Sequence, residues 1–268
     1  MMEHVRVSGL DVAYQRTGSG PPIVFVHGAV EDSRTWTPQF EALQDEFTVV
    51  AWDEPGVGQS DDLPAEGFAL ADYAACLAGV IDSVGLGPAD VVGLSWGSTV
   101  TLDLFHRHPE VVSTLILTGG DAGWKGSLPS DEVAARIAGV QRMLDAPAED
   151  FDLALPGLFA GEPPAPFVPL LEAMAAEVRR HSMRTALSIM AATDLNFVLP
   201  SISVPTLLLW GESDVRSPLR IAHQFEQAIP DATLVVIPAC GHVANLDQPD
   251  EFNRAAREFC RRHRPTGD

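Results

Sequence analysis

The sequence predicts an α/β fold in which helices flank a mostly parallel sheet of eight strands. Short β-branched runs alternate with amphipathic segments, which is the pattern of strands that feed helices covering both faces of such a sheet. The chain has 268 residues, of which 46% are hydrophobic, and can therefore bury a substantial core as a single unit. Its mean hydropathy of +0.09 is typical of a compact chain rather than a disordered one.

The predicted strands start with a hairpin and continue as single apolar runs. In chain order they cover His4–Val7, Val12–Gln15, Ile23–Val26, Phe47–Trp52, Asp90–Leu94, Thr114–Thr118, Thr206–Trp210 and Thr233–Ile237. The predicted helices between them cover Leu70–Val84, Trp96–His108, Pro218–Ala228 and Pro249–Arg262. This alternation is the basis for predicting parallel pairing.

Residues 121–199 differ from the rest of the chain because they lose the strand-like pattern. The segment is rich in Ala, Leu, Met and Pro, and predicts several short helices separated by Pro-Gly breaks. Pro156-Gly157 and the proline-rich stretch 161–169 predict turns or an extended linker. We therefore expect a helical lid at 121–199, inserted between two parts of one core, 1–120 and 200–268.

The charge of the chain limits its partners. A formal net charge of -20 repels phosphate backbones and anionic lipid, so we expect no nucleic acid and no membrane partner. The first ten residues include Glu3, His4 and Arg6 where a signal peptide needs an apolar run, and no later run reaches membrane-spanning length. We expect a cytoplasmic protein with a small-molecule partner, and the oligomeric state stays open.

The cysteines predict neither a disulfide framework nor a metal site. Cys76, Cys240 and Cys260 lie far apart, with no CxxC spacing. Cys240 lies two residues before a histidine, but a thiol nucleophile would need its own base. No His/Asp/Glu cluster has ligand spacing and no Gly-rich phosphate loop is present, so we expect no metal and no organic cofactor.

The strongest motif is Gly93-Leu94-Ser95-Trp96-Gly97, which follows an apolar strand and precedes a helix. This is the context in which G-x-S-x-G forms a nucleophile elbow. A sharp turn forces the serine into a strained backbone conformation, and the flanking glycines let the chain pass closely enough to expose the hydroxyl. We therefore predict that Ser95 is a nucleophile.

A serine hydroxyl needs a base, and His242 is the best of the eight histidines. It lies in a loop after the last predicted strand, from which a side chain can reach over the sheet edge. The other seven fit the opening strand, a turn or helices, and we assign them structural or solvent-facing roles; they are His4, His27, His106, His108, His181, His223 and His263.

The imidazole in turn needs a carboxylate, for which Asp214 is the best candidate. It follows a strongly apolar strand, at the sheet edge where open α/β folds bind ligands. Asp121 and, less so, Glu212 are the competitors. Two backbone N–H groups should stabilise the oxyanion, one from Trp96 and one from the loop after the strand Ile23–Val26, where we choose Ala29 over Val30.

These segments together resemble the α/β-hydrolase superfamily. The resemblance includes His27-Gly28, the turn at 53–60, the serine elbow, the turn at 211–214 and Gly241-His242. It spans nearly the whole chain, is strong for the core and weak for the lid, and implies an α/β-hydrolase fold with the chain order Ser, Asp, His. Pro55 departs from the arginine that many relatives carry, which concerns loop support.

The expected activity is hydrolysis of a carboxylic ester or lactone of a small, largely apolar substrate through an acyl-Ser95 intermediate. Alternatives on the same triad are carbon–carbon bond hydrolysis, acyl transfer, peracid formation and proline iminopeptidase-like activity. Serine at the elbow argues against halide and epoxide chemistry, for which relatives use a carboxylate nucleophile. A receptor that keeps the fold without catalysis is the non-enzymatic alternative.

Pocket residues are harder to predict than the triad. Val215 and Val243 adjoin the acid and the base, so we expect both to contact the substrate. The lid also offers large apolar side chains, of which Trp124 is our pocket candidate and each is individually more typical of lid core. These are Trp124, Met143, Phe151, Leu155, Phe159, Phe167 and Met174.

Overall fold

A computed structural model describes residues 2–64, 67–147 and 157–263, and contains one eight-stranded sheet. The strands are β1 (Met2–Val7), β2 (Leu10–Thr17), β3 (Pro22–Val26), β4 (Thr48–Trp52), β5 (Ala89–Leu94), β6 (Val112–Thr118), β7 (Thr206–Gly211) and β8 (Ala232–Ile237). Their order across the sheet is β1-β2-β4-β3-β5-β6-β7-β8. The β1–β2 and β2–β4 pairs are antiparallel, whereas all pairs from β4 to β8 are parallel. The predicted fold class is confirmed.

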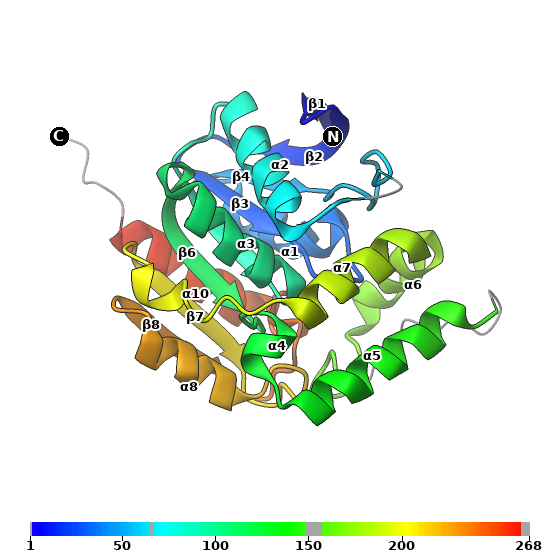
Figure 1. The fold of residues 1–268 in the computed structure, drawn as a ribbon. Coiled ribbons are helices and arrows are strands. Elements are labelled where there is room, and N and C mark those ends of the chain that lie inside the picture. The colour runs from blue at the N-terminus through cyan, green and yellow to red at the C-terminus, as the bar shows by residue number, and fades with distance from the viewer. Residues whose placement is uncertain (1, 65–66, 148–156, 264–268) are drawn as a thin grey trace.

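Helices cover both faces of the sheet (Figure 1). They are α1 (Thr37–Leu43), α2 (Leu70–Ser83), α3 (Trp96–Arg107), α4 (Trp124–Ser127), α5 (Ser130–Asp145), α6 (Val168–Glu177), α7 (Arg180–Ala192), α8 (Leu219–Ala228), α9 (Ala244–Asp247) and α10 (Pro249–Arg262). Short 3-10 turns add η1 (Ser33–Trp36), η2 (Pro109–Val111), η4 (Ala165–Phe167) and η5 (Leu199–Ser201).

The core consists of two apolar clusters, one on each face of the sheet. In β3, Val24 and Val26 belong to the cluster under α2, α3 and α8, whereas Ile23 and Phe25 belong to the cluster under α1 and α10. Successive side chains of a strand point to opposite faces, so a strand buried on both sides must be apolar throughout. This explains why the central strands read as unbroken apolar runs.

The helices α4 to α7 lie between β6 and β7 in the chain and group together at one end of the sheet (Figure 1). They fall within the predicted lid, whose boundaries and role stay a prediction. Helix α5, with sixteen residues, is longer than the short helices expected. No proline interrupts it, because Pro129 lies just before the helix and the next proline, Pro147, lies after its end. Pro169 lies in the first turn of α6, where proline is tolerated, rather than in a linker.

Helix α1 was not expected from the sequence. It has only seven residues and follows η1 directly, so its apolar pattern is too short to be recognised. No helix in the described part of the chain is long and apolar enough to cross a membrane.

Candidate active site

The turn between β5 and α3 holds Ser95 in a strained conformation. Its φ of 54° lies in the left-handed region, and its N–H donates to the carbonyl of Thr118. A Cβ on Gly97 would lie 2.2 Å from the carbonyl oxygen of Val26, and one on Gly93 would lie 2.7 Å from that of Gly97. Both positions therefore require glycine, and the tight packing fixes the serine at the carboxyl end of the sheet.

His242 lies in the loop that follows β8 and faces Ser95. The backbone N–H groups of His242 and Val243 donate to the carbonyl of Leu158, which anchors the loop. The imidazole Nε2 is 2.9 Å from Ser95 Oγ, and Nδ1 is 2.9 Å from Asp214 Oδ2. These distances are satisfied together when Nδ1–H donates to the carboxylate and the hydroxyl donates to Nε2.

Asp214 is fixed by its own loop after β7. Its Oδ1 accepts the backbone N–H groups of Arg216 and Ser217, each at 2.8 Å. The side chain is fully buried, and the hydroxyl of Ser217 donates to the carbonyl of Gly120 after β6. Three segments that are distant in the sequence thus bring Ser95, His242 and Asp214 into one hydrogen-bonded chain.

The competing carboxylates are differently placed. Asp121 Oδ1 accepts from the N–H of Gly123 at 2.9 Å and the hydroxyl of Thr99 at 3.2 Å, and no hydrogen bond to His242 is present within the described residues. Burial raises the pKa of Asp121 to about 6. Glu212 is exposed, and its Oε2 accepts the N–H of Ala239. The geometry therefore favours Asp214 as the partner of His242.

The predicted oxyanion donors are open. Trp96 is the first residue of α3, where a helix leaves its N–H without an internal acceptor. Ala29 lies in the loop after β3 and lines the same cavity as Ser95. Among the described residues, neither backbone N–H donates to a protein acceptor. Both N–H groups are therefore available, and their role as oxyanion donors stays a prediction.

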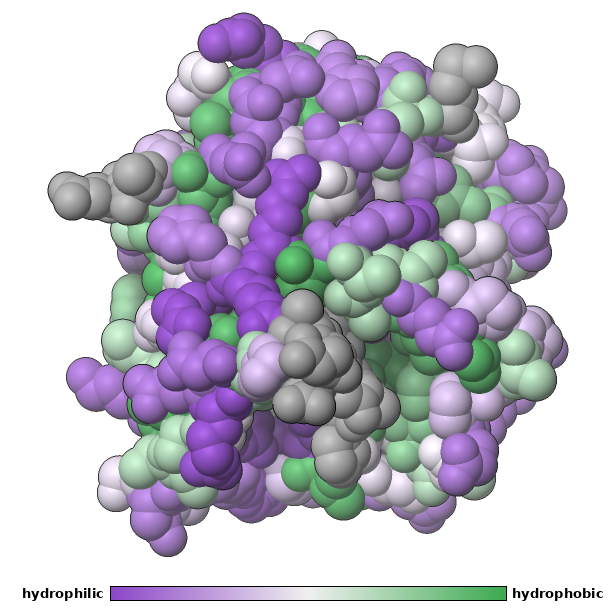
Figure 2. All heavy atoms as spheres, turned by 90° about the vertical axis from the view of Figure 1, so that its right-hand side faces the viewer, coloured by the Kyte–Doolittle hydropathy of each residue, from purple (hydrophilic) through white to green (hydrophobic). Residues whose placement is uncertain are grey.

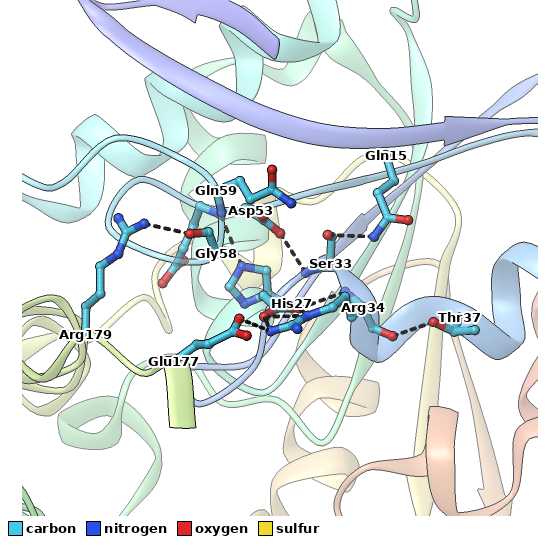
Figure 3. A network of polar contacts seen from close by, with 12 residues as sticks. Gln15, His27, Ser33, Arg34, Thr37, Asp53, Gly58, Gln59, Glu177 and Arg179 are labelled. Atoms are coloured by element: carbon cyan, nitrogen blue, oxygen red, sulfur yellow. Dashed lines mark hydrogen bonds and ion pairs between the residues drawn. The ribbon is translucent and has the colours of Figure 1, made fainter. Parts of the chain in front are cut away.

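A polar network holds the loop after β3, which carries Ala29, in place (Figure 3). The ring of His27 accepts the backbone N–H of Glu54 at Nε2, 3.1 Å away, and Asp53 Oδ1 accepts the N–H of Ser33 at 2.9 Å. Glu54 Oε2 in turn accepts the indole N–H of Trp96 at 2.7 Å, and burial raises the pKa of Glu54 to about 7. The turns after β3 and β4 are thereby tied to the start of α3.

The same network reaches the helices between β6 and β7. Arg34 pairs with Glu177 at the end of α6, at 2.6 Å. Arg179, between α6 and α7, donates to the carbonyls of Gly58 and Ser60 (Figure 3). These contacts fasten α6 and α7 to the core beside the loop that carries Ala29.

A cavity of about 60 Å³ opens above Ser95. It is lined by Gly28, Ala29, Val30, Glu31, Leu94, Ser95, Asp121, Trp124, Arg136, Val140, Met143, Leu158, Met183, Leu187, Met190, Arg216, His242 and Val243. A second, more open hollow of about 320 Å³ lies among α4, α5 and α7 and shares Trp124, Val140 and Leu187 with the first. Apolar side chains gather around a hollow on the face that carries α5 to α7 (Figure 2).

Two of the three predicted pocket residues line the cavity, and one does not. Trp124 and Val243 are buried against it. Val215 is 67% exposed and lies outside the lining, so the cavity gives no support to its predicted contact with the substrate. The physical reason is the turn closed by Asp214 Oδ1 on the next two N–H groups, which directs Val215 outward and Arg216 inward.

The other apolar side chains of the predicted lid divide between several places. Met143 lines the cavity, and Met174 lines a smaller neighbouring one. Phe159 and Phe167 pack against the core cluster under α1 and α10. Phe151 and Leu155 lie outside the described residues.

Three charged residues of the cavity were missed by the sequence reasoning: Glu31, Arg136 and Arg216. Glu31 Oε2 accepts the N–H of Gly28 at 3.0 Å, and burial raises the pKa of this carboxyl. A signal existed for Arg216, because it stands in the turn of the predicted acid. None existed for Arg136, whose direction depends on how α5 packs.

The site has no built-in metal centre within the described residues, where no group of three or more His, Cys, Asp or Glu side chains could hold an ion. The buried thiol of Cys240 is also poorly suited to chemistry, because burial raises its pKa to about 12. What the geometry offers is a serine, a histidine and a carboxylate in one line, beside open N–H donors. That set can transfer an acyl group.

Comparison with known families agrees with this chemistry. The profile of the Alpha/beta hydrolase family matches residues 23–255, which include every strand from β4 to β8. The chain belongs to the alpha/beta hydrolase family. It is a hydrolytic enzyme, and the resemblance noted in the sequence is confirmed.

Individual relatives of this hydrolase act on different compounds. A 2-hydroxy-6-oxononadienedioate/2-hydroxy-6-oxononatrienedioate hydrolase from Burkholderia vietnamiensis is 29% identical, over 94% of this chain and 92% of its own. The structure of an esterase from Exiguobacterium antarcticum matches with a TM-score of 0.85 and 25% sequence identity. The match covers 97% of this chain and 100% of the esterase chain. The structure of the N-acyl homoserine lactone degrading enzyme Est816 matches with a TM-score of 0.79 and 26% sequence identity. The match covers 96% of this chain and 100% of the Est816 chain.

Proposed function

We propose that this hydrolase cleaves a carboxylic ester or lactone of a small, largely apolar substrate through an acyl-Ser95 intermediate. The observation that carries the proposal is the 2.9 Å separation of Ser95 Oγ and His242 Nε2, with Asp214 2.9 Å behind the imidazole. The small cavity above the serine, in which half of the lining residues are Met, Leu or Val, supports a small apolar substrate.

The reaction proceeds in two halves. Ser95 Oγ attacks the ester carbonyl while its proton passes to His242 Nε2, and the N–H groups of Ala29 and Trp96 donate to the resulting oxyanion. The carbonyl reforms as the carbon–oxygen bond to the alcohol breaks, and His242 returns the proton to that alcohol. Water then attacks the acyl-enzyme, His242 takes its proton, and the acid is released as the same proton returns to Ser95.

Asp214 acts on the histidine and not on the substrate. Its carboxylate holds Nδ1–H, which leaves Nε2 free to accept a proton, and it stabilises the imidazolium that forms in each half-reaction. The two N–H groups that Asp214 already accepts keep its carboxylate oriented without any rearrangement during turnover.

Labelling and mutation test this proposal together. A fluorophosphonate probe should modify the native protein at Ser95, and Ser95→Ala should abolish labelling and lower kcat on p-nitrophenyl acetate by about 10⁶-fold. A matched control is Ser98→Ala, which removes a buried hydroxyl that donates to the carbonyl of Gly93 in the same turn. An unlabelled native protein, or an active Ser95→Ala variant, would overturn the proposal.

The relative from Burkholderia vietnamiensis favours one second candidate, carbon–carbon bond hydrolysis of a ring-cleavage diketone by the same groups. Both candidates predict labelling at Ser95, so the discriminating measurement is product analysis on short esters, lactones and such diketones. Rapid diketone cleavage without ester turnover would favour the second candidate.

A further inference from the structure

The side chain of Arg216 lines the cavity but has no role in the chemistry described so far. Arg216 follows the proposed acid by two residues, and its backbone is held on both sides. Its N–H donates to Asp214 Oδ1 at 2.8 Å, and its carbonyl accepts from Nη2 of Arg136 at 2.7 Å. The backbone is therefore fixed, and the partly buried side chain lines the same cavity as Ser95 and His242.

The two cations of the cavity differ in what balances them. Arg136 pairs with Glu132 at 2.7 Å and lies 5.6 Å over the ring of Trp124. The guanidinium of Arg216 donates no hydrogen bond to any of the described residues, and burial and the nearby Arg136 both lower its pKa, against the opposing effect of Asp214. Withdrawing a guanidinium from water without giving it an acceptor costs free energy, which an anionic ligand would recover.

The protein's own carboxylates in the cavity are already occupied. Glu31 accepts from the N–H of Gly28 and the hydroxyl of Thr35, and Asp121 accepts from Gly123 and Thr99. Burial also raises the pKa of both carboxyls, which reduces the negative charge that they bring to the cavity. Asp214 is committed to His242. Arg216 is thus the charged group that the cavity leaves for a ligand.

We propose that the guanidinium of Arg216 binds a carboxylate of the substrate, so that the preferred substrates are esters or lactones with a carboxylate a few bonds from the scissile carbonyl. A planar guanidinium matches a carboxylate with two parallel hydrogen bonds. The rest of the lining, which includes Val140, Met143, Met183, Leu187 and Met190, suits an apolar spacer. This inference rests on the proposed function and narrows its substrate class.

Matched substrate pairs test the inference on the unmodified protein. Monomethyl succinate, glutarate and adipate are each compared with the methyl ester of the corresponding primary amide, which has the same shape without the charge. A second series places the carboxylate on the alcohol side, as butyryl glycolate against butyryl glycolamide. We expect the charged member of at least one pair to have a kcat/KM about 10- to 100-fold higher, as for other hydrogen bonds to charged groups.

Variants then assign the preference to one residue. Arg216→Gln should reduce the ratio of kcat/KM between the charged and the neutral member of the pair to less than about threefold, because the charge-assisted bonds are lost. The matched control is Arg220→Gln, a more exposed arginine four residues further on that lies 3.3 Å from Glu132. It should keep the full preference.

A binding measurement supplies a second readout. The free diacid of the preferred length should inhibit the wild type competitively, whereas its diamide should not, and Arg216→Gln should lose that inhibition. Thermal melting and fluorophosphonate labelling establish that the variant is folded.

The possible failures are distinguishable. If Ser95 is labelled and the neutral esters react as fast as the charged ones or faster, the carboxylate inference is overturned and the proposed function stands. If Ser95 is not labelled and no ester reacts, the proposed function itself fails. A preference that survives in Arg216→Gln also overturns the assignment to Arg216.

Discussion

The floor and the roof of the cavity are built in different ways. The floor consists of strand-end turns that carry Ala29, Ser95 and His242, and hydrogen bonds hold these turns to each other. The roof consists of side chains from α4, α5 and α7, namely Trp124, Arg136, Val140, Met143, Met183, Leu187 and Met190. Most of these are apolar and packed together. The proposed chemistry thus depends on the backbone geometry of the turns, whereas the apolar part of the cavity depends on how the helices pack.

The largest expected effect tests the floor, where two buried carboxylates follow neighbouring strands. Asp214→Asn should lower kcat by about 10⁴-fold, because the amide no longer holds His242 in the required tautomer. Asp121→Asn should stay within about tenfold of the wild type, because Asp121 makes no hydrogen bond to His242 within the described residues. The measurement is kcat on p-nitrophenyl acetate, with melting curves as a control for folding. The opposite ranking would move the acid to Asp121.

The second prediction concerns how the roof is fastened to the floor. Arg179→Met removes charge-assisted bonds to the carbonyls of Gly58 and Ser60 and should lower the free energy of unfolding by about 2 kcal/mol. Glu177→Gln breaks the more exposed pair with Arg34 and should cost less than about 1 kcal/mol. Urea unfolding of both variants gives the comparison. Equal losses of unfolding free energy in the two variants would contradict the prediction that the less exposed contacts of Arg179 stabilise the fold more than the Arg34–Glu177 pair.

The third prediction concerns the pH dependence of stability, in which the buried Asp121 should differ from exposed aspartates. Burial raises the pKa of Asp121 from its ordinary value of 3.8 to about 6 in the folded protein. The folded state therefore binds more protons between these values, and the contribution of Asp121 to stability falls as the pH rises toward 6 and stays low above it.

Asp121→Asn removes that contribution, so its stability relative to the wild type should rise by about 1 kcal/mol between pH 5 and pH 7.5. Chemical unfolding at both pH values measures the difference. Asp231→Asn, at an exposed aspartate, is the control and should show no such change. A pH-independent difference for Asp121→Asn would show that its carboxyl titrates normally.

The smallest effect on activity is expected at Cys240. This residue lies two positions before His242, but it has no role in the proposed reaction and does not line the cavity. Its buried thiol has a pKa of about 12, so a thiol-disulfide reagent at pH 8 should react with it only after unfolding. Cys240→Ala should keep activity within about threefold of the wild type. Fast labelling of the native protein at this residue, accompanied by inactivation, would contradict the assignment.

Much of the floor could be predicted from sequence because its residues stand on turns next to recognisable strands. Ser95 lies between glycines after an apolar run, and Asp214 and His242 follow the last two strands. Local pattern and the edge rule for parallel sheets were sufficient to bring these three together. Their catalytic roles stay a prediction that the labelling experiment tests.

The roof could not be predicted in the same way. The inward direction of Arg136 depends on how α5 packs on α7, which no local pattern records. Val215 was expected in the cavity on grounds of hydrophobicity, but the turn closed by two hydrogen bonds to Asp214 brings Arg216 there, a residue for which the sequence reasoning made no prediction. Short α1 was missed for a related reason, since seven residues give less than two full turns of periodicity.

The elbow around Ser95 has a consequence for the evolution of new reactions on this scaffold. Its φ of 54° occurs where the backbone approaches closely at Gly93 and Gly97. A cysteine or an aspartate at position 95 would meet the same backbone cost and be presented at the same point in space. A substitution at this one position can therefore replace the nucleophilic atom while the surrounding backbone keeps its conformation.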